Sequence, residues 1–181
     1  MNKILKWSLI VLASLVVLLF VAFQVLKSQT KKNSPESTIE YKFGDNTLTV
    51  FYNRPSKKGR EIFGSLVPYG KVWRTGANEA TTFTCTKDLN IGGKTLPAGK
   101  YTLWTIPEKE SWTVIFNTKM YPWGVGGNGA SREEAFDALS VQVPVEALSQ
   151  SVEMFDITFE GTAPAQMVLS WDLTRVAVPL N

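Results

Sequence analysis

The most regular pattern in the chain is an uncharged apolar run of twenty residues from Trp7 to Leu26, interrupted only by Ser8, Ser14 and Gln24. A helix of that length is about 30 Å long, which matches the hydrocarbon thickness of a bilayer. The run does not end in the small residues that mark a cleaved signal peptide. The pattern therefore predicts a transmembrane signal anchor over residues 1–27, with a cleaved signal sequence as the alternative.

Lysines flank this run on both sides, with Lys3 and Lys6 before it and Lys27, Lys31 and Lys32 after it. The positive-inside comparison is close to a draw. An N-terminal apolar helix followed by a globular domain most often leaves that domain outside, which favours a single-pass protein of the inner membrane with its domain on the periplasmic or extracytoplasmic side. Residues 28–36 are polar and predict a short tether.

After the tether, apolar and polar residues alternate in short runs. Residues 37–43 and 47–52 alternate on either side of a turn that begins at Gly44, which predicts a β-hairpin. Further short runs, separated by glycine and proline turns, continue to the end of the chain. Residues 37–181 therefore predict one all-β domain, mainly an antiparallel β-sandwich or barrel-like fold.

Four segments of this domain carry more specific expectations. Residues 62–67 are typical of a strand, whereas residues 131–139 predict two turns of helix and residues 145–149 one turn. Residues 118–130, with four glycines and Pro122, predict the longest loop. Loops of that length are often functional.

The amino-acid composition excludes several kinds of catalytic and metal-binding site. The chain contains no histidine and a single cysteine, Cys85, so histidine-dependent triads, cysteine–histidine dyads and histidine metal sites are excluded. Cys85 alternates with Phe83 and is expected to point inward. We expect no metal site and no cofactor.

Charge argues against nucleic acid as a partner. The formal net charge is +3, but removing the five lysines around the apolar run leaves −2 for the rest of the chain. A nucleic-acid-binding domain needs a basic patch on its folded part.

The sequence Trp-Arg-Thr-Gly-Ala-Asn-Glu-Ala-Thr at 73–81 is the most specific motif. Together with residues 91–103, 112–117 and 171–179, it resembles the DUF2911 family, a domain of unknown function found in extracytoplasmic proteins of Bacteroidetes-type bacteria. The resemblance covers about residues 37–180. It implies fold and location, and it brings no known activity, ligand or cofactor.

The same motif supplies the first candidate site, because Trp73, Arg74, Asn78 and Glu79 place an indole, a guanidinium, a carboxamide and a carboxylate close together. Such a group could bind a sugar hydroxyl, a carboxylate or a peptide end. The structural interpretation is that Arg74 bridges to Glu79 above a buried Trp73, with Asn78 satisfying loop backbone groups.

Exposed aromatic residues are the second candidate, since sugar rings stack on indoles. Trp123 in the glycine-rich loop is the tryptophan most expected to be exposed, with packing inside the loop as the alternative to binding. Trp104, Trp112 and Trp171 lie in strand runs and are expected in the core.

Paired carboxylates are the remaining route to catalysis without histidine, as in glycoside hydrolysis. The available acids are Glu61, Glu79, Asp137, Glu153, Asp156 and Asp172. Sequence spacing does not bring any two of them together.

The sequence thus specifies no reaction. It favours a non-catalytic ligand-binding or interaction module of the cell envelope, whose partners are the membrane and a carbohydrate, a peptide or an envelope protein. The alternatives are a carboxylate-dependent hydrolase acting on an envelope glycan and a structural partner of another membrane protein.

Overall fold

The computed structural model describes residues 2–127, 129–162 and 164–181. The chain divides into two compact units, Met1–Asn33 and Ser34–Asn181. The second unit, which we call the β-domain, contains every residue of the hydrophobic core.

The first unit is a single helix, α1 (Lys3–Asn33), about 45 Å long. Its apolar side chains from Ile4 to Leu26 are exposed. The helix is long and apolar enough to cross a membrane. It ends at Asn33, so residues 28–33, where the sequence predicts a tether, are helical here.

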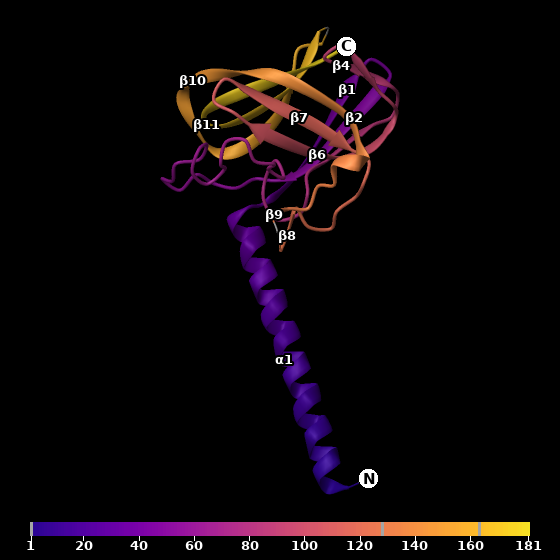
Figure 1. Ribbon diagram of the computed structural model, residues 1–181, viewed down its shortest axis with the longest axis vertical. Helices are drawn as coiled ribbons and strands as arrows, with labels where there is room; N and C mark the ends of the chain where they lie inside the picture. Colours follow the sequence, from indigo (N-terminus) through magenta and orange to yellow (C-terminus); the bar gives the residue numbers. More distant parts are fainter. Residues whose placement is uncertain (1, 128, 163) are drawn as a thin grey trace. The chain divides into compact units, whose positions relative to one another are not determined.

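The β-domain is an antiparallel β-structure, as predicted (Figure 1). Its sheet order is β1-β2-β3-β6-β7-β10-β11-β4-β5, and β8 and β9 form a separate small hairpin. The strands are β1 (Glu36–Phe43), β2 (Asn46–Asn53), β3 (Thr82–Cys85), β4 (Leu89–Ile91), β5 (Lys94–Leu96), β6 (Gly99–Pro107), β7 (Ser111–Asn117), β8 (Val125–Gly126), β9 (Gly129–Ala130), β10 (Asp137–Glu160) and β11 (Ala165–Leu180).

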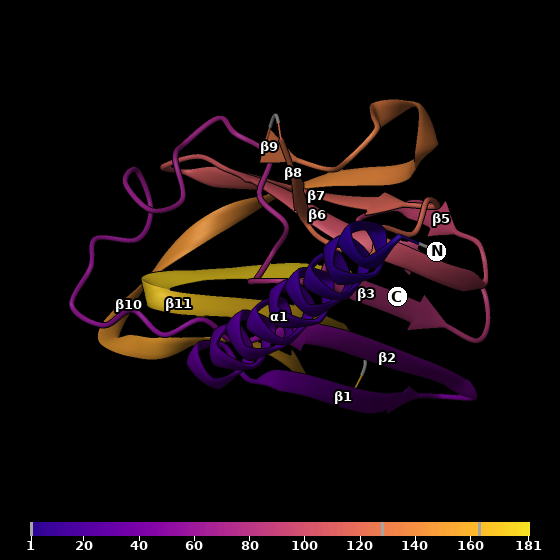
Figure 2. The same ribbon diagram turned by 90° about the horizontal axis from the view of Figure 1, so that it is seen from below.

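The long strand β10 belongs to two parts of the sheet. Its residues 137–144 pair with β7, whereas its residues 145–160 pair with β11 through two register shifts. In Figure 2, β10 curves from the side of β7 round to the yellow β11. This bend lets the two parts of the sheet enclose one core.

Side-chain alternation on β6 and β7 sorts residues between that core and the outer face. Leu103, Val114 and Phe116 belong to the main core, while Trp104 and Ile115 form a second, smaller cluster with Ala80. A strand buried on both faces needs a cover on its outer side. This cover is supplied by Val72, Ala80, Tyr121 and Ala130.

The predicted hairpin at residues 37–52 is confirmed as β1–β2, with Gly44 in a left-handed conformation at the turn. Trp104, Trp112 and Trp171 are fully buried, as expected from their strand runs. Cys85 is also buried, its thiol lies 3.4 Å from the Pro97 carbonyl oxygen, and burial raises its pKa.

Three local predictions were wrong. Residues 131–139 form only one 3₁₀ turn, η1 (Glu134–Phe136), which has no side-chain cap, because residues 137–139 already belong to β10 and pair with β7. Residues 145–149 lie in β10, where Val145 pairs with Val176 and cross-strand packing outweighs local helix propensity. Residues 62–67 form a tight turn closed by the 2.8 Å bond from Val67 N to Ile62 O.

The longest connection also differs from the prediction. It runs between β2 and β3, over residues 54–81, and not over 118–130. Both of its ends are tied to strands by backbone hydrogen bonds, and its last part carries the candidate motif.

Candidate functional site

The motif at 73–81 is a short excursion from the edge of β6. On one side of it, Trp73 and Thr105 exchange backbone hydrogen bonds of 2.7 and 3.0 Å; on the other, Leu103 N donates to Thr81 O at 2.8 Å. The intervening residues 74–80 leave the strand line. Their two ends are therefore fixed on neighbouring residues of one buried strand.

Trp73 is placed in the core. Its side chain is 9 % exposed and its ring stacks on Trp171, with centroids 5.8 Å apart. Its indole Nε1–H donates to the Gly76 carbonyl oxygen at 3.1 Å. Trp73 thus supports the excursion from beneath, and its ring face is covered by Trp171.

Two threonines hold the inner side of the excursion. The Thr75 and Thr105 hydroxyl oxygens lie 3.1 Å apart, and the Thr81 hydroxyl donates to Thr75 O at 2.6 Å. Both Thr75 and Thr81 are fully buried. These bonds satisfy the polar groups that the irregular backbone brings into the interior.

The backbone here is strained. Thr75 and Asn78 adopt left-handed φ angles of 56° and 55°, and Gly76 has φ 144°. A Cβ atom at Gly76 would lie 2.8 Å from the Asn53 carbonyl oxygen, so only glycine fits there. Non-glycine residues in this region cost on the order of 1 kcal/mol or more each, and such residues concentrate at functional sites.

Arg74 has no partner where the structural interpretation expected one. Its Nε atom is buried without a hydrogen bond, and within the part of the chain that the structure describes Arg74 makes no ion pair. Burial lowers the pKa of the Arg74 guanidinium from its ordinary value. The predicted bridge to Glu79 is therefore not formed.

Glu79 is engaged by a residue that sequence reasoning missed. Asn53 at the end of β2 is fully buried, donates from Nδ2 to Glu79 Oε2 at 3.1 Å, and accepts from Asn78 Nδ2 at 3.4 Å. The one signal in the sequence that could have indicated Asn53 is that a polar residue occupies an inward position of an alternating strand.

The glycine-rich loop meets the motif at Gly124. Gly124 N donates to Asn78 O at 3.0 Å, and Ser131 N donates to Gly124 O at 3.2 Å. A Cβ at Gly124 would lie 2.3 Å from Arg74 Cδ, so the glycine backbone rests on the arginine stem. The structure thus brings the two predicted contact regions together.

We call Arg74, Asn78, Glu79 and Gly124 the Arg74 niche. Trp123, the other predicted binding residue, directly precedes Gly124 and is half-buried. Beneath both segments lies the outer cluster of β6 and β7, where Trp104 packs edge-on against Tyr121 with ring centroids 5.4 Å apart. The niche therefore has a rigid apolar floor.

Besides Glu79, which accepts from Asn53, four of the six candidate acids interact with specific groups on other elements. Asp156 pairs with Arg54 at 3.1 Å and accepts from Tyr52 at 2.7 Å, while Asp172 pairs with Lys57. Asp137 pairs with Arg132, and Glu153 accepts from the backbone of Lys58 at 2.9 Å. These contacts account for the acids as parts of the scaffold. Among the described residues, no three Asp, Glu or Cys side chains gather as a metal site would require.

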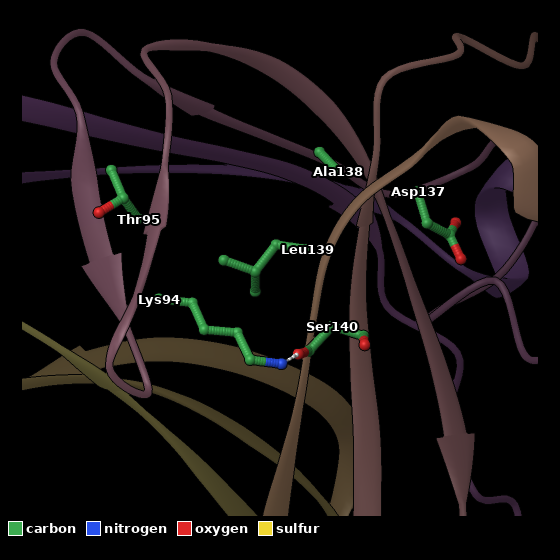
Figure 3. Close-up of a pocket in the computed structure, with 6 residues that line it drawn as sticks. All are labelled: Lys94, Thr95, Asp137, Ala138, Leu139 and Ser140. Atoms are coloured by element: carbon green, nitrogen blue, oxygen red, sulfur yellow. Dashed lines mark hydrogen bonds between the residues drawn. The ribbon is translucent and has the colours of Figure 1, made fainter.

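A concave region lies elsewhere in the β-domain, between β5 and the start of β10 (Figure 3). This pocket of about 310 Å³ is lined by Lys94, Thr95 and residues 137–140. Lys94 Nζ crosses it to donate to Ser140 O at 2.9 Å, and Asp137 is turned towards Arg132. Its one cation already has a protein partner, unlike Arg74.

Comparison with known proteins identifies a family. The profile of a family described as "Protein of unknown function (DUF2911)" matches residues 34–180, which is nearly the whole β-domain. No curated protein and no solved structure matches the chain significantly.

Proposed function

The chain belongs to the DUF2911 family, whose function is unknown, and we propose that its β-domain is a non-catalytic ligand-binding module of the cell envelope, anchored by α1, with the Arg74 niche as its binding site.

The unpartnered guanidinium of Arg74 is the observation that carries this proposal. Taking an arginine nitrogen out of water without a hydrogen bond costs about 1–3 kcal/mol, and the cost rises with charge. The surrounding segment holds the side chain there with two left-handed non-glycine residues, Thr75 and Asn78, and with Gly76, where only glycine fits. An anion that pairs with the terminal amino groups of Arg74 would offset the cost of holding the charge away from water, although Nε itself stays unpaired, whereas a purely structural arginine would have its counter-ion in the fold.

The terminal amino groups of Arg74 are the part that such a ligand meets. Among the described residues they have no hydrogen-bond partner, and unlike Nε they are not among the buried atoms that lack one, in a side chain that is half-buried overall. The niche is thus a fixed cation whose stem is covered and whose tip reaches solvent.

The binding experiment uses the full chain in lipid nanodiscs. Thermal shifts are measured with a small panel of di-N-acetylchitobiose, glucuronate and N-acetylglycine, in the wild type and in Arg74→Gln. We expect at least one compound to raise the wild-type melting temperature and to lose that effect in Arg74→Gln. Lys109→Gln, which removes an exposed cation in the β6–β7 turn, is the matched control and should behave as the wild type.

Two outcomes would refute the binding role. No response to any compound removes the ligand-binding proposal and favours a structural partner of another membrane protein. Consumption of the disaccharide by the wild type would instead indicate the hydrolase alternative.

The proposed location is the inner membrane, with the β-domain on the periplasmic or extracytoplasmic side. It is supported by the exposed apolar surface of α1 and by its place at the N-terminus. The buried thiol of Cys85 makes a clean test possible. In Lys109→Cys, a membrane-impermeant maleimide should label the introduced thiol in intact spheroplasts, with the wild type as background. Labelling only after lysis would place the domain in the cytoplasm.

A further inference from the structure

We infer that the ligand of the Arg74 niche carries a carboxylate, which binds end-on to the two terminal amino groups of the Arg74 guanidinium. This inference rests on the proposed binding function and names the chemical class of its ligand.

The sign of the ligand's charge follows from the surroundings of Arg74. Burial lowers the pKa of this guanidinium, and no carboxylate of the described chain lies within ion-pair distance of it. Glu79, the acid five residues further on, accepts from Asn53 instead. A neutral ligand would leave the positive charge uncompensated, whereas an anion supplies the missing partner.

The accessible edge of the guanidinium defines the geometry. Gly124 covers the stem, with its would-be Cβ 2.7 Å from Arg74 Cβ and 3.0 Å from Cγ, and Nε is sealed from water. Arg74 as a whole is half-buried, and its two terminal amino groups are the nitrogen atoms left for a ligand. Two parallel N–H donors at that spacing match the two oxygens of a carboxylate.

The charges of the niche favour a ligand group with a single negative charge. The niche contains one cation, and its other ionisable group, Glu79, is an acid on the residue next to Asn78. A doubly charged phosphate would keep an uncompensated charge beside that acid. The Asn78 amide, which donates to Asn53, adds no further positive site.

Peptide ends and acidic sugars both present such a carboxylate, and matched probes separate them. The experiment titrates the full chain in nanodiscs with four compounds, each acid paired with its isosteric amide: N-acetylglycine, N-acetylglycinamide, glucuronate and glucuronamide. Inorganic phosphate and sulfate are titrated in parallel. Binding is followed by calorimetry and by the Arg74 Nε–H signal in nitrogen-15 spectra, which burial should protect from exchange.

We expect at least one acid to bind about tenfold or more tightly than its amide and to shift the Arg74 Nε–H signal. Arg74→Lys should keep the charge but lose most of this preference, because an ammonium lacks the paired donors. Gly124→Ala should weaken acid binding without altering the guanidinium itself, since the added methyl group displaces the arginine stem. The acid that responds identifies the peptide or the sugar as the source.

Three results would overturn the inference. Equal affinity for acid and amide would show that the site does not recognise the carboxylate, although the proposed binding function would still hold. Tighter binding of phosphate or sulfate than of either acid would show the wrong class of anion. Failure of all six compounds, together with failure of the chitobiose arm, would remove the binding function as well. The acid–amide comparison needs only the wild type, so it stands even where a variant does not fold.

Discussion

The backbone N–H of Gly124 lies 3.0 Å from the carbonyl oxygen of Asn78, and this hydrogen bond joins two connections that are distant in the sequence. One is the excursion of residues 74–80 and the other is the glycine-rich loop of residues 118–130. Because Gly124 also contacts the stem of Arg74, the loop and the arginine are positioned together.

Gly124→Ala should therefore lower the free energy of unfolding of the β-domain by about 1–3 kcal/mol, as overpacking does elsewhere. The added methyl group would lie 2.3 Å from Arg74 Cδ. Urea denaturation measures the effect. Gly127→Ala is the control in the same loop, because no atom lies within 4 Å of its would-be Cβ. Equal effects of the two substitutions would show that Gly124 does not rest on Arg74.

Gly76→Ala should cost more, about 3 kcal/mol, because close contact and backbone strain add. The new Cβ would lie 2.8 Å from Asn53 O, and φ at this position is 144°. Gly59→Ala isolates the strain, since Gly59 has φ 69° with open space around it. We expect it to cost about 1 kcal/mol. A Gly76→Ala domain as stable as Gly59→Ala, measured by thermal and urea unfolding, would show that the excursion relaxes easily.

Much of the fold follows from periodicity in the sequence. Alternation predicts the β1–β2 hairpin and the burial of Trp104, Trp112 and Trp171, since a two-residue period puts every second side chain on one face. The same argument fails at Val145 to Ser149. Its local sequence suits a helical turn, but its partner Val176 comes from the next strand, β11, and a cross-strand contact leaves no local signal.

The candidate site was predicted in outline only. The motif and the glycine-rich loop each stood out by composition, but nothing in the sequence shows that Gly124 meets Arg74. The prediction of an Arg74–Glu79 bridge was wrong. Glu79 instead accepts a hydrogen bond from Asn53, which lies 26 residues earlier in the sequence, on strand β2. Side-chain partners across such a distance depend on the sheet order, which short strands of similar pattern do not determine.

Tyr52 should make the stability of the β-domain depend on pH in the alkaline range. Burial and its hydrogen bond to Asp156 raise the pKa of Tyr52 from 10.0 to about 12. Folding thus favours the protonated phenol. Its contribution to stability is complete below the unfolded pKa of 10.0 and is lost as the pH rises through about 12.

Tyr52→Phe tests this directly. At neutral pH the variant should be less stable than the wild type by about 1–2 kcal/mol, because Asp156 loses a buried donor. The difference should shrink between pH 10.0 and about pH 12. Urea denaturation at several pH values measures it, with phenolate absorbance as an independent titration of Tyr52. A difference that stays constant over this range would contradict the assignment.

Asp172 gives the opposite pH dependence. It lies in β11 with a left-handed φ of 52°, where its carboxylate pairs with Lys57 and accepts from Ser151 at 2.8 Å. Burial alone would raise its pKa, but the hydrogen bonds from Lys57 and Ser151 outweigh burial and place the pKa of Asp172 below the ordinary 3.8. Its contribution to stability is therefore complete above 3.8 and is lost as the pH falls through the folded value.

Asp172→Asn keeps the shape of the side chain, and asparagine tolerates the left-handed backbone, so this variant removes mainly the charge. We expect it to lower the free energy of unfolding at pH 7 by about 1 kcal/mol, with the difference from the wild type vanishing in acid. Asp45→Asn removes the exposed ion pair with Lys87 at the β1–β2 turn and should change stability much less. Asp172→Ala removes the same charge but also the polar side-chain group that lets aspartate and asparagine tolerate a left-handed φ, so it should be less stable than Asp172→Asn at every pH. If the asparagine variant kept its deficit in acid strong enough to protonate Asp172, where both side chains are neutral, the deficit would not come from the lost charge, and the Lys57 pair would contribute nothing.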